Sequence, residues 1–235
     1  MAAYRNSQST NWLARAIGLS MLAAFAIAAF EANGSGVISL AEAAELGSGQ
    51  FAERLDHEIR FGIVEIAATL ATATGFIVLL KPIHAGLAIV GGALRALPAG
   101  FAAFGAYKFS TMKTTLGNAP GDAMPKEDLS AAAEQVSALN FDTFHWGLIT
   151  ASVGAAIGYA LFFHGRMIPR VISGYGLLAS LGACIGASAI YLAPGLSDLM
   201  FPAYAIANAV AYFSLMLWLL IRGVDTSYWN GLQAD

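Results

Sequence analysis

The chain has 235 residues, and only 11% of them are charged, against about 25% in an average soluble protein. A formal net charge of −3 excludes the basic excess of a nucleic-acid-binding domain, so we expect no nucleic-acid partner. Hydrophobic residues make up 57% of the chain, which excludes intrinsic disorder, and the single cysteine, Cys184, excludes an internal disulfide. The composition therefore predicts a polytopic membrane protein in contact with a lipid bilayer.

Helices that cross a membrane need about 20 consecutive, mostly apolar residues. Six segments satisfy this requirement: 12–30, 61–80, 83–106, 144–163, 171–193 and 199–221. The first also resembles a cleavable signal peptide, but we expect it to be retained as a transmembrane helix. The predicted fold class is all-α, with one domain over 1–235. It is a bundle of six transmembrane helices, with short amphipathic helices in two long outer loops.

Basic residues near the ends of these segments predict the orientation of the chain. They are Arg5, Arg15, Lys81, Arg166, Arg170 and Arg222. All six fall on one side of the membrane if the two termini share a compartment. Because basic residues favour the cytoplasmic side, we expect both termini in the cytoplasm and the long loops 31–60 and 107–143 outside.

Both long loops contain helical patterns of their own. A capping box begins at Ser39, and Pro125 opens a second helical stretch. Apolar residues recur on one helical face in each loop: Phe51, Leu55 and Ile59 in the first, and Leu129, Ala132, Val136 and Leu139 in the second. These patterns predict amphipathic helices on the outer membrane surface or over the bundle. The simpler alternative is a long loop that only covers its own backbone.

Small residues indicate where helices approach closely in lipid. The fourth segment carries Gly154 and Gly158, and the fifth carries Gly182 and Gly186. Five glycines lie along the third segment: Gly86, Gly91, Gly92, Gly100 and Gly105. We expect these three helices to form the tight centre of the bundle, although the same glycines also suit contacts in a homo-oligomer or with other membrane subunits.

Six polar residues fall between the middle of the predicted membrane and its outer surface: Glu65, Arg95, His145, Tyr191, Tyr204 and Asn208. An ionisable side chain inside a membrane usually faces a partner or a cavity, because lipid solvates charge poorly. The distribution predicts a polar pocket near the outer side. Two alternatives remain open, namely a structural ion pair between Glu65 and Arg95, and a simple extension of Arg95 toward water.

Histidines provide a second, weaker pattern. His84 and His164 both lie at the predicted inner boundary, and two histidines at one depth on facing helices are able to ligate a haem. No haem attachment motif accompanies them, so they are weak haem-ligand candidates. The sequence also has no nucleophile elbow, zinc helix, phosphate loop or dinucleotide fingerprint, and we predict no metal site.

Several stretches carry a resemblance to a known family. They are ARAIGL in the first segment, LLKPIH after the second, ALRAL in the third, LWLLIRGVD at the end of the sixth, and FHWGLITASVGAAIGYALFFHGRMIPRVISGYGLLASLG across the fourth and fifth. In order and spacing the chain resembles the bacterial integral-membrane domain-of-unknown-function family number 4386. The resemblance implies a protein of the bacterial inner membrane, and it implies no particular activity.

Three classes of function fit these observations. The first is a binding protein that holds a small amphiphile or lipid in the outer pocket. The second is an accessory or structural subunit of a larger membrane complex. The third is an intramembrane enzyme with Glu65 or His145 as general base, or a haem protein. We favour a non-catalytic membrane protein.

Overall fold

The computed structural model describes residues 2–32, 41–42, 45, 47–117 and 125–225. Within these ranges the chain forms helices and no strands, which confirms the all-α fold class. The long helices are α1 (Ala2–Ala32), α3 (Ser48–Leu80), α4 (Ala85–Gly117), α5 (Lys126–Gly165), α6 (Arg170–Leu192) and α7 (Ser197–Ile221). A short 3-10 helix, η1 (Pro194–Leu196), precedes α7.

Of the helices in the described part of the chain, α3 to α7 are long and apolar enough to cross a membrane. They overlap five of the predicted segments but differ at the ends, because α3, α4 and α5 each continue well beyond the predicted bounds on one side. The segment predicted from residue 83, for example, begins in the turn before α4, because Pro82 interrupts the helical hydrogen bonding there. The remaining segment, 12–30, lies within α1, and its crossing of the membrane stays a prediction.

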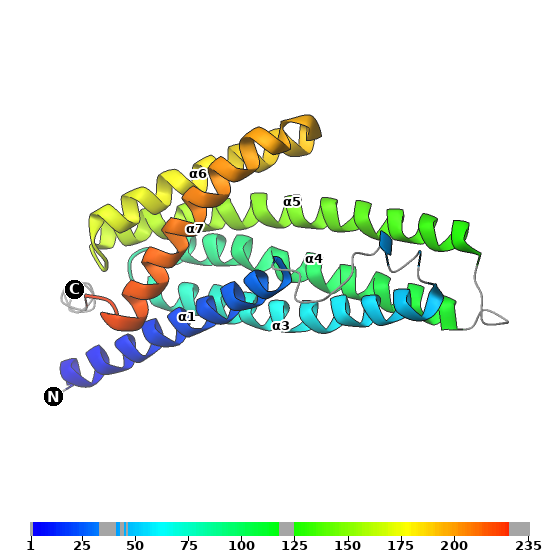
Figure 1. Cartoon of the computed structure of the whole chain (residues 1–235). Coiled ribbons are helices and arrows are strands. Elements are labelled where there is room, and N and C mark those ends of the chain that lie inside the picture. Colours follow the sequence, from blue (N-terminus) through cyan, green and yellow to red (C-terminus); the bar gives the residue numbers. More distant parts are fainter. Residues whose placement is uncertain (1, 33–40, 43–44, 46, 118–124, 226–235) are drawn as a thin grey trace.

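Three of the five candidate membrane spans found among the described residues are much longer than a membrane crossing requires. α3 and α4 have 33 residues each and α5 has 40. At about 1.5 Å per residue these helices are roughly 50 to 60 Å long, against about 30 Å for the hydrocarbon core of a bilayer. Figure 1 shows that α3, α4 and α5 run side by side and extend beyond the other helices at one end. We call this the extended end, and the opposite end, with turns 81–84 and 166–169, the turn end.

The extended end contains the residues for which we predicted separate amphipathic helices. The structure corrects this prediction, because residues 48–60 are the first part of α3 and residues 126–143 are the first part of α5. The helical hydrogen bonds continue into the apolar part since no proline or turn interrupts them. The predicted apolar faces are nevertheless correct, because they pack together in one core: Phe51, Leu55, Phe109, Leu129, Ala133 and Val136. The capping box at Ser39 begins outside the described residues.

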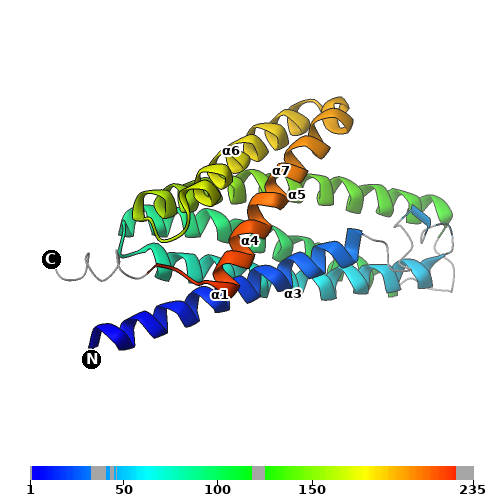
Figure 2. The same cartoon turned by 60° about the vertical axis from the view of Figure 1, so that its left-hand side comes forward.

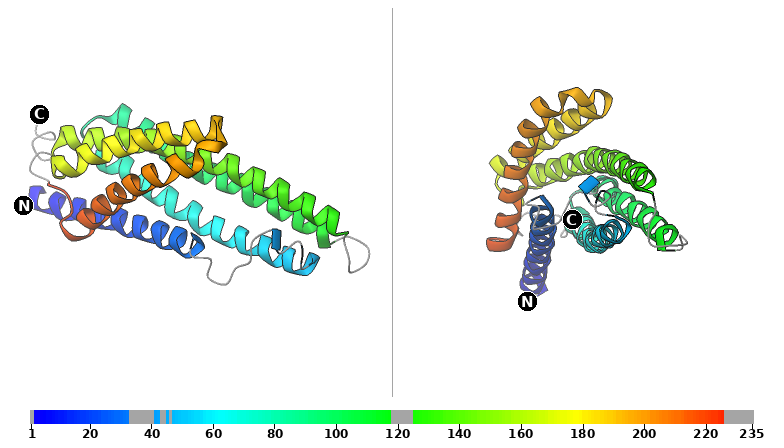
Figure 3. Two further views of the ribbon diagram at one scale, coloured as in Figure 1. Left: turned by 45° about the horizontal axis from the view of Figure 1, so that its top comes forward. Right: turned by 45° about the vertical axis from the view of Figure 1, so that its right-hand side comes forward.

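A second, larger core lies toward the turn end and joins α1, α3, α4, α5, α6 and α7. Its fully buried members include Ile17, Met21, Leu79, Phe162 and Leu215. Figures 2 and 3 show that α6 follows α5 away from the turn end, and that α7 returns across the bundle to meet α1. The pair α6 and α7 therefore diverges from the three long helices.

The backbones of α4 and α5 approach each other closely at a pair of glycines. A Cβ atom added to Gly154 would come within 2.5 Å of the Gly91 carbonyl oxygen and 2.9 Å of the Arg95 backbone nitrogen. Gly186 is equally necessary, because the ring of Tyr204 lies against it. Gly182, in contrast, has no atom of the described residues within 4 Å of such a Cβ. The predicted contact role therefore holds for Gly154 and Gly186, while Gly182 faces open space.

Candidate functional site

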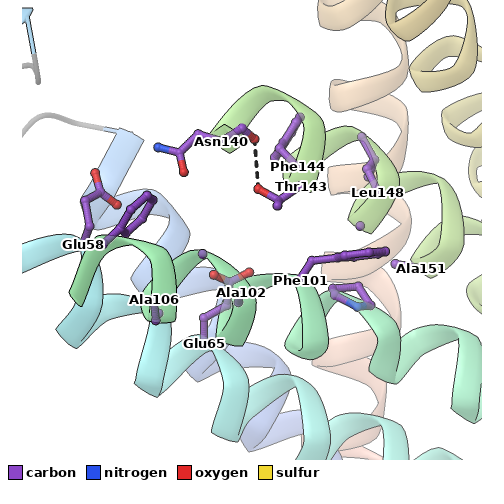
Figure 4. A pocket seen from close by; sticks show the side chains of 15 residues that line it. Glu58, Glu65, Phe101, Ala102, Ala106, Asn140, Thr143, Phe144, Leu148 and Ala151 are labelled. Atoms are coloured by element: carbon purple, nitrogen blue, oxygen red, sulfur yellow. Dashed lines mark hydrogen bonds between the residues drawn. The ribbon is translucent and has the colours of Figure 1, made fainter. Parts of the chain in front are cut away.

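A cavity of about 430 Å³ lies between α3, α4 and α5, where the apolar part of these helices passes into the extended end. We call it the extended-end cavity. Its polar lining residues are Glu58, Glu65, Asn140 and Thr143, and its aromatic ones are Phe101, Phe109 and Phe144. Figure 4 shows the two carboxylates rising from the same side of α3, facing Asn140 and Thr143 on α5.

Small residues on all three helices create this space. They are Gly62 on α3, Ala102, Gly105 and Ala106 on α4, and Gly147 and Ala151 on α5. A Cβ atom added to Gly62 would meet none of the described atoms within 4 Å, so the described residues leave the cavity open beside that position. The helices are held at this spacing by the core of the extended end on one side and by the Gly91–Gly154 contact on the other.

Glu65 carries the uncompensated charge of this cavity. Glu58, two helical turns away on the same face of α3, forms an ion pair with Arg54. Thr143 donates its hydroxyl hydrogen to the Leu139 carbonyl oxygen at 2.8 Å. Glu65 is exposed at the edge of the cavity, and none of the ion pairs or hydrogen bonds between described residues involves it. A free carboxylate next to aromatic rings is suited to attract a cation.

Arg95 and Asn208 line a different cavity, of about 200 Å³, which we call the Arg95 chamber. It lies among α1, α3, α4, α5 and α7. Pro98, Leu148 and Ala151 line both cavities and thus form a shared wall between them. The structure consequently places Glu65 and Arg95 in neighbouring cavities, and no ion pair joins them in the part of the chain that it describes.

His145 and Tyr191 meet in an aromatic cluster between α5 and α6. Their ring centroids are 6.4 Å apart, and Phe141 lies against both rings. The Nδ1 atom of His145 is 2.8 Å from the Phe141 carbonyl oxygen, while its Nε2 atom is buried without a hydrogen-bond partner among the described residues. His145 is 5% exposed and does not line the extended-end cavity, so Glu65 and His145 do not share one site.

Tyr204 packs in the contact between α6 and α7, against Gly186 and Leu148. Its hydroxyl group is buried and also lacks a hydrogen-bond partner within the described residues. The predicted pocket residues thus divide into four places: Glu65 in the extended-end cavity, Arg95 and Asn208 in the chamber, His145 with Tyr191, and Tyr204 between α6 and α7.

The weak haem-ligand candidates, His84 and His164, are both exposed near the turn end. His84 stands at the start of α4, where its Nδ1 atom accepts a hydrogen bond from the Leu87 backbone N–H at 3.2 Å. That contact is typical of a helix-capping residue. Among the residues that the structure describes, no three His, Cys, Asp or Glu side chains gather in a way that could hold a metal ion.

Sequence reasoning missed several residues of both cavities. Glu58, Asn140 and Thr143 were assigned to loops, although the spacing of seven residues between Glu58 and Glu65 on one helix was a usable signal. Tyr159 and Tyr212 of the chamber carry no charge and lie in apolar segments, so nothing in the sequence singled them out.

Comparison with known proteins gives one match. The chain matches the family described as Domain of unknown function (DUF4386) over residues 16–223, which is most of its length. No curated protein and no solved structure matches the chain.

Proposed function

Because the chain belongs to the DUF4386 family, whose description assigns no activity, we propose a function from the geometry alone: this membrane protein binds a small amphiphile with a positively charged headgroup in the extended-end cavity. The observation that carries the proposal is the unpaired carboxylate of Glu65 at a cavity with aromatic walls. A cationic headgroup would neutralise that carboxylate and would also be attracted by the faces of the phenylalanine rings.

The dimensions of the cavity support a small amphiphile. Its volume of about 430 Å³ falls within the roughly 300 to 1,000 Å³ that is usual for small-molecule pockets. One wall is polar and the other, made by Pro98, Phe101 and Leu148, is apolar. Phe144 is 52% exposed at the border of the cavity. An apolar tail would leave along this side into lipid, while the headgroup remains with the polar wall.

The orientation of the chain completes this proposal. Lys81, Arg166, Arg170 and Arg222 all lie in or next to the short turns of the turn end, which supports a cytoplasmic turn end under the positive-inside rule. We infer that α1 is a sixth membrane crossing, that both termini are cytoplasmic, and that the protein resides in a bacterial inner membrane. The extended-end cavity would then receive its ligand from the outer side.

A binding measurement with matched variants tests the proposal. The protein is reconstituted in phosphatidylcholine nanodiscs and titrated calorimetrically with dodecyltrimethylammonium, with empty nanodiscs as the blank. We expect saturable binding that Glu65→Gln weakens and that Gly62→Leu abolishes, because the new Cβ meets no described atom within 4 Å and the larger side chain takes up space in the cavity. Gly49→Leu is the matched control. It makes the same change on the same helix, and its added Cβ atom also meets no described atom within 4 Å. Binding that is equal in wild type and Gly62→Leu would refute the proposal.

A second candidate function, that of an accessory subunit, is favoured by the space around Gly182. This glycine lines an apolar groove of about 680 Å³ between α6 and α7, together with Leu178 and Ile185, which are 71% and 66% exposed. Small residues in an open groove would admit a helix of another membrane protein. Cross-linking from Gly182→Cys in native membranes distinguishes a subunit role from ligand binding alone. A defined cross-link to another protein supports the subunit role, and cross-links to lipid alone oppose it.

A further inference from the structure

The Arg95 chamber has the opposite electrostatic character to the extended-end cavity. Its polar lining consists of Arg95, Asn208 and five hydroxyl residues, namely Thr69, Thr72, Ser152, Tyr159 and Tyr212. Among the described residues, neither Asp nor Glu lines the chamber, so Arg95 gives this lining a net positive charge. The cation is also far from a helix end, because it lies ten residues into α4.

Arg95 has no anionic partner in the described part of the chain. The ion pairs found there join Arg54 to Glu58 and Lys113 to Asp56, and both lie in the extended end. No hydrogen bond between described residues uses the Arg95 guanidinium group. The guanidinium carbon lies 4.6 Å from the ring centroid of Phe76, which is a cation–π contact. A cation at membrane depth with unused donors is costly and indicates a missing partner.

The neighbouring tyrosines cannot provide that missing charge, because they serve to hold the helices together. Tyr159 donates its hydroxyl hydrogen to the Ala211 carbonyl oxygen at 3.0 Å, which connects α5 to α7. Tyr212 donates to the Met21 carbonyl oxygen at 3.0 Å, which connects α7 to α1. Thr72 likewise donates to the Ala68 carbonyl oxygen. These groups fix the walls of the chamber around Arg95 and leave the guanidinium donors available.

We propose that the Arg95 chamber binds the carboxylate of a monocarboxylic acid. The planar guanidinium group matches a carboxylate with two parallel hydrogen bonds, and a single cation balances a single negative charge. A dianion would keep an excess charge in a region of low dielectric constant. The volume of about 200 Å³ equals that of about seven water molecules in the liquid, which is enough for a carboxylate and a short aliphatic stem.

The aliphatic part of the acid has an apolar surface to occupy. Met21, Ala155 and Leu215 line the chamber beside its polar groups. The shared wall at Pro98, Leu148 and Ala151 separates the acid from the extended-end cavity. This second site differs from the first in location and in charge, so it does not depend on the function proposed above. The acid has two possible sources, a short soluble molecule or a fatty acid from the bilayer.

Thermal unfolding in phosphatidylcholine nanodiscs tests the proposal with three single-chain ligands of one length. Octanoate should raise the midpoint temperature saturably, because a ligand that binds the folded state stabilises it. Octan-1-ol and octyltrimethylammonium should not. Carbon-13 spectra of carboxyl-labelled octanoate with the wild-type protein should show a second, bound signal. Equal effects of octanoate and octanol, or no bound carboxyl signal, would overturn the proposal without any variant.

Substitutions of Arg95 test whether octanoate binds in the Arg95 chamber. Arg95→Gln should abolish the response to octanoate, and Arg95→Lys should weaken binding roughly tenfold, since an ammonium group keeps the charge but loses the bidentate geometry. Arg60→Gln is the matched control, because it removes an exposed arginine that lines neither cavity. A full response in Arg95→Gln would overturn the proposal. Butanoate and dodecanoate identify the source: stronger butanoate binding indicates a soluble acid, and stronger dodecanoate binding indicates a fatty acid.

Discussion

The two cavities share a wall and differ in almost every other property. The extended-end cavity is acidic, and its space arises from glycine and alanine positions on α3, α4 and α5. The Arg95 chamber is basic, less than half as large, and surrounded by tyrosines whose hydroxyl groups bind backbone carbonyls of α1 and α7. The difference shows that opposite charges in neighbouring segments need not pair, because Pro98, Leu148 and Ala151 stand between them.

The surroundings of the two cavities explain how such different charges are tolerated. The extended end carries several charged residues that pair with one another, such as Asp56 with Lys113. Glu65 lies at its border and therefore remains accessible to solvent. Arg95 lies among apolar helices, where each charge needs a specific partner. We therefore expect the extended-end cavity to select its ligand loosely, and the chamber to select by charge.

The largest expected effect comes from a substitution that should disrupt the extended-end cavity and leave the Arg95 chamber intact. Phe51 is fully buried in the core of the extended end, and Phe51→Ala should destabilise that core by about 3 to 5 kcal/mol. The turn-end core does not contain Phe51 and should persist. Limited proteolysis should then cleave the extended end, and dodecyltrimethylammonium binding should be lost while octanoate binding remains.

The control for this experiment is Phe104→Ala, which removes the same side chain from a position that is 48% exposed on α4. It should leave the proteolysis pattern unchanged. Loss of both ligands in Phe51→Ala would mean that the two regions unfold as one unit, and the comparison between independent cavities would fail.

A smaller effect is expected where α4 and α5 approach behind Arg95. Gly154→Leu should destabilise the protein by about 1 to 3 kcal/mol, because its Cβ meets backbone atoms of Gly91 and Arg95 that cannot move aside. Reversible unfolding in detergent measures the loss. Gly182→Leu, in the same kind of glycine pair but beside open space, should cost much less. Equal losses of stability in Gly154→Leu and Gly182→Leu would show that the close α4–α5 contact does not restrict the residue at position 154.

The sequence was sufficient to predict the helices but not the division of the polar residues. Apolar runs of about 20 residues form α-helices in lipid, because a helix satisfies the backbone hydrogen bonds within the segment itself. The helices α3 to α7 were therefore predicted directly from these runs. The stripe from Phe51 to Ile59 correctly predicted a buried face, but its partner on α5 depends on the continuity of both helices. Glu65 and Arg95 were both placed between the middle of the membrane and its outer surface, yet depth along a helix says nothing of rotation about its axis. The rotation is set by contacts such as Gly91 with Gly154, which only the packed structure contains.

Removal of one tyrosine hydrogen bond beside the Arg95 chamber should have a smaller effect on stability, and it should affect only one of the two cavities. Tyr159→Phe removes the hydrogen bond to the Ala211 carbonyl oxygen and should cost about 0.6 kcal/mol, a typical value inside a membrane. Octanoate binding should weaken, while dodecyltrimethylammonium binding should not change. Tyr175→Phe is the control, because Tyr175 makes the same kind of bond to Ala207 from an exposed position outside both cavities. An unchanged octanoate affinity in Tyr159→Phe would show that the chamber does not need this contact.

The smallest expected effect lies in the extended end and depends on pH. Lys113 donates a hydrogen bond to Asp56 at 2.6 Å, which holds the pKa of that carboxyl group below its ordinary value. A lowered pKa in the folded state means that the pair stabilises the protein at neutral pH and loses its effect as the pH falls through the acidic range where Asp56 becomes protonated. Proteolysis of the extended end in wild type and Asp56→Asn should therefore differ slightly at pH 7 and converge in acid. The difference should also shrink in high salt, because both side chains are partly exposed. A difference that persists in acid would assign the effect of the substitution to packing rather than to the ion pair.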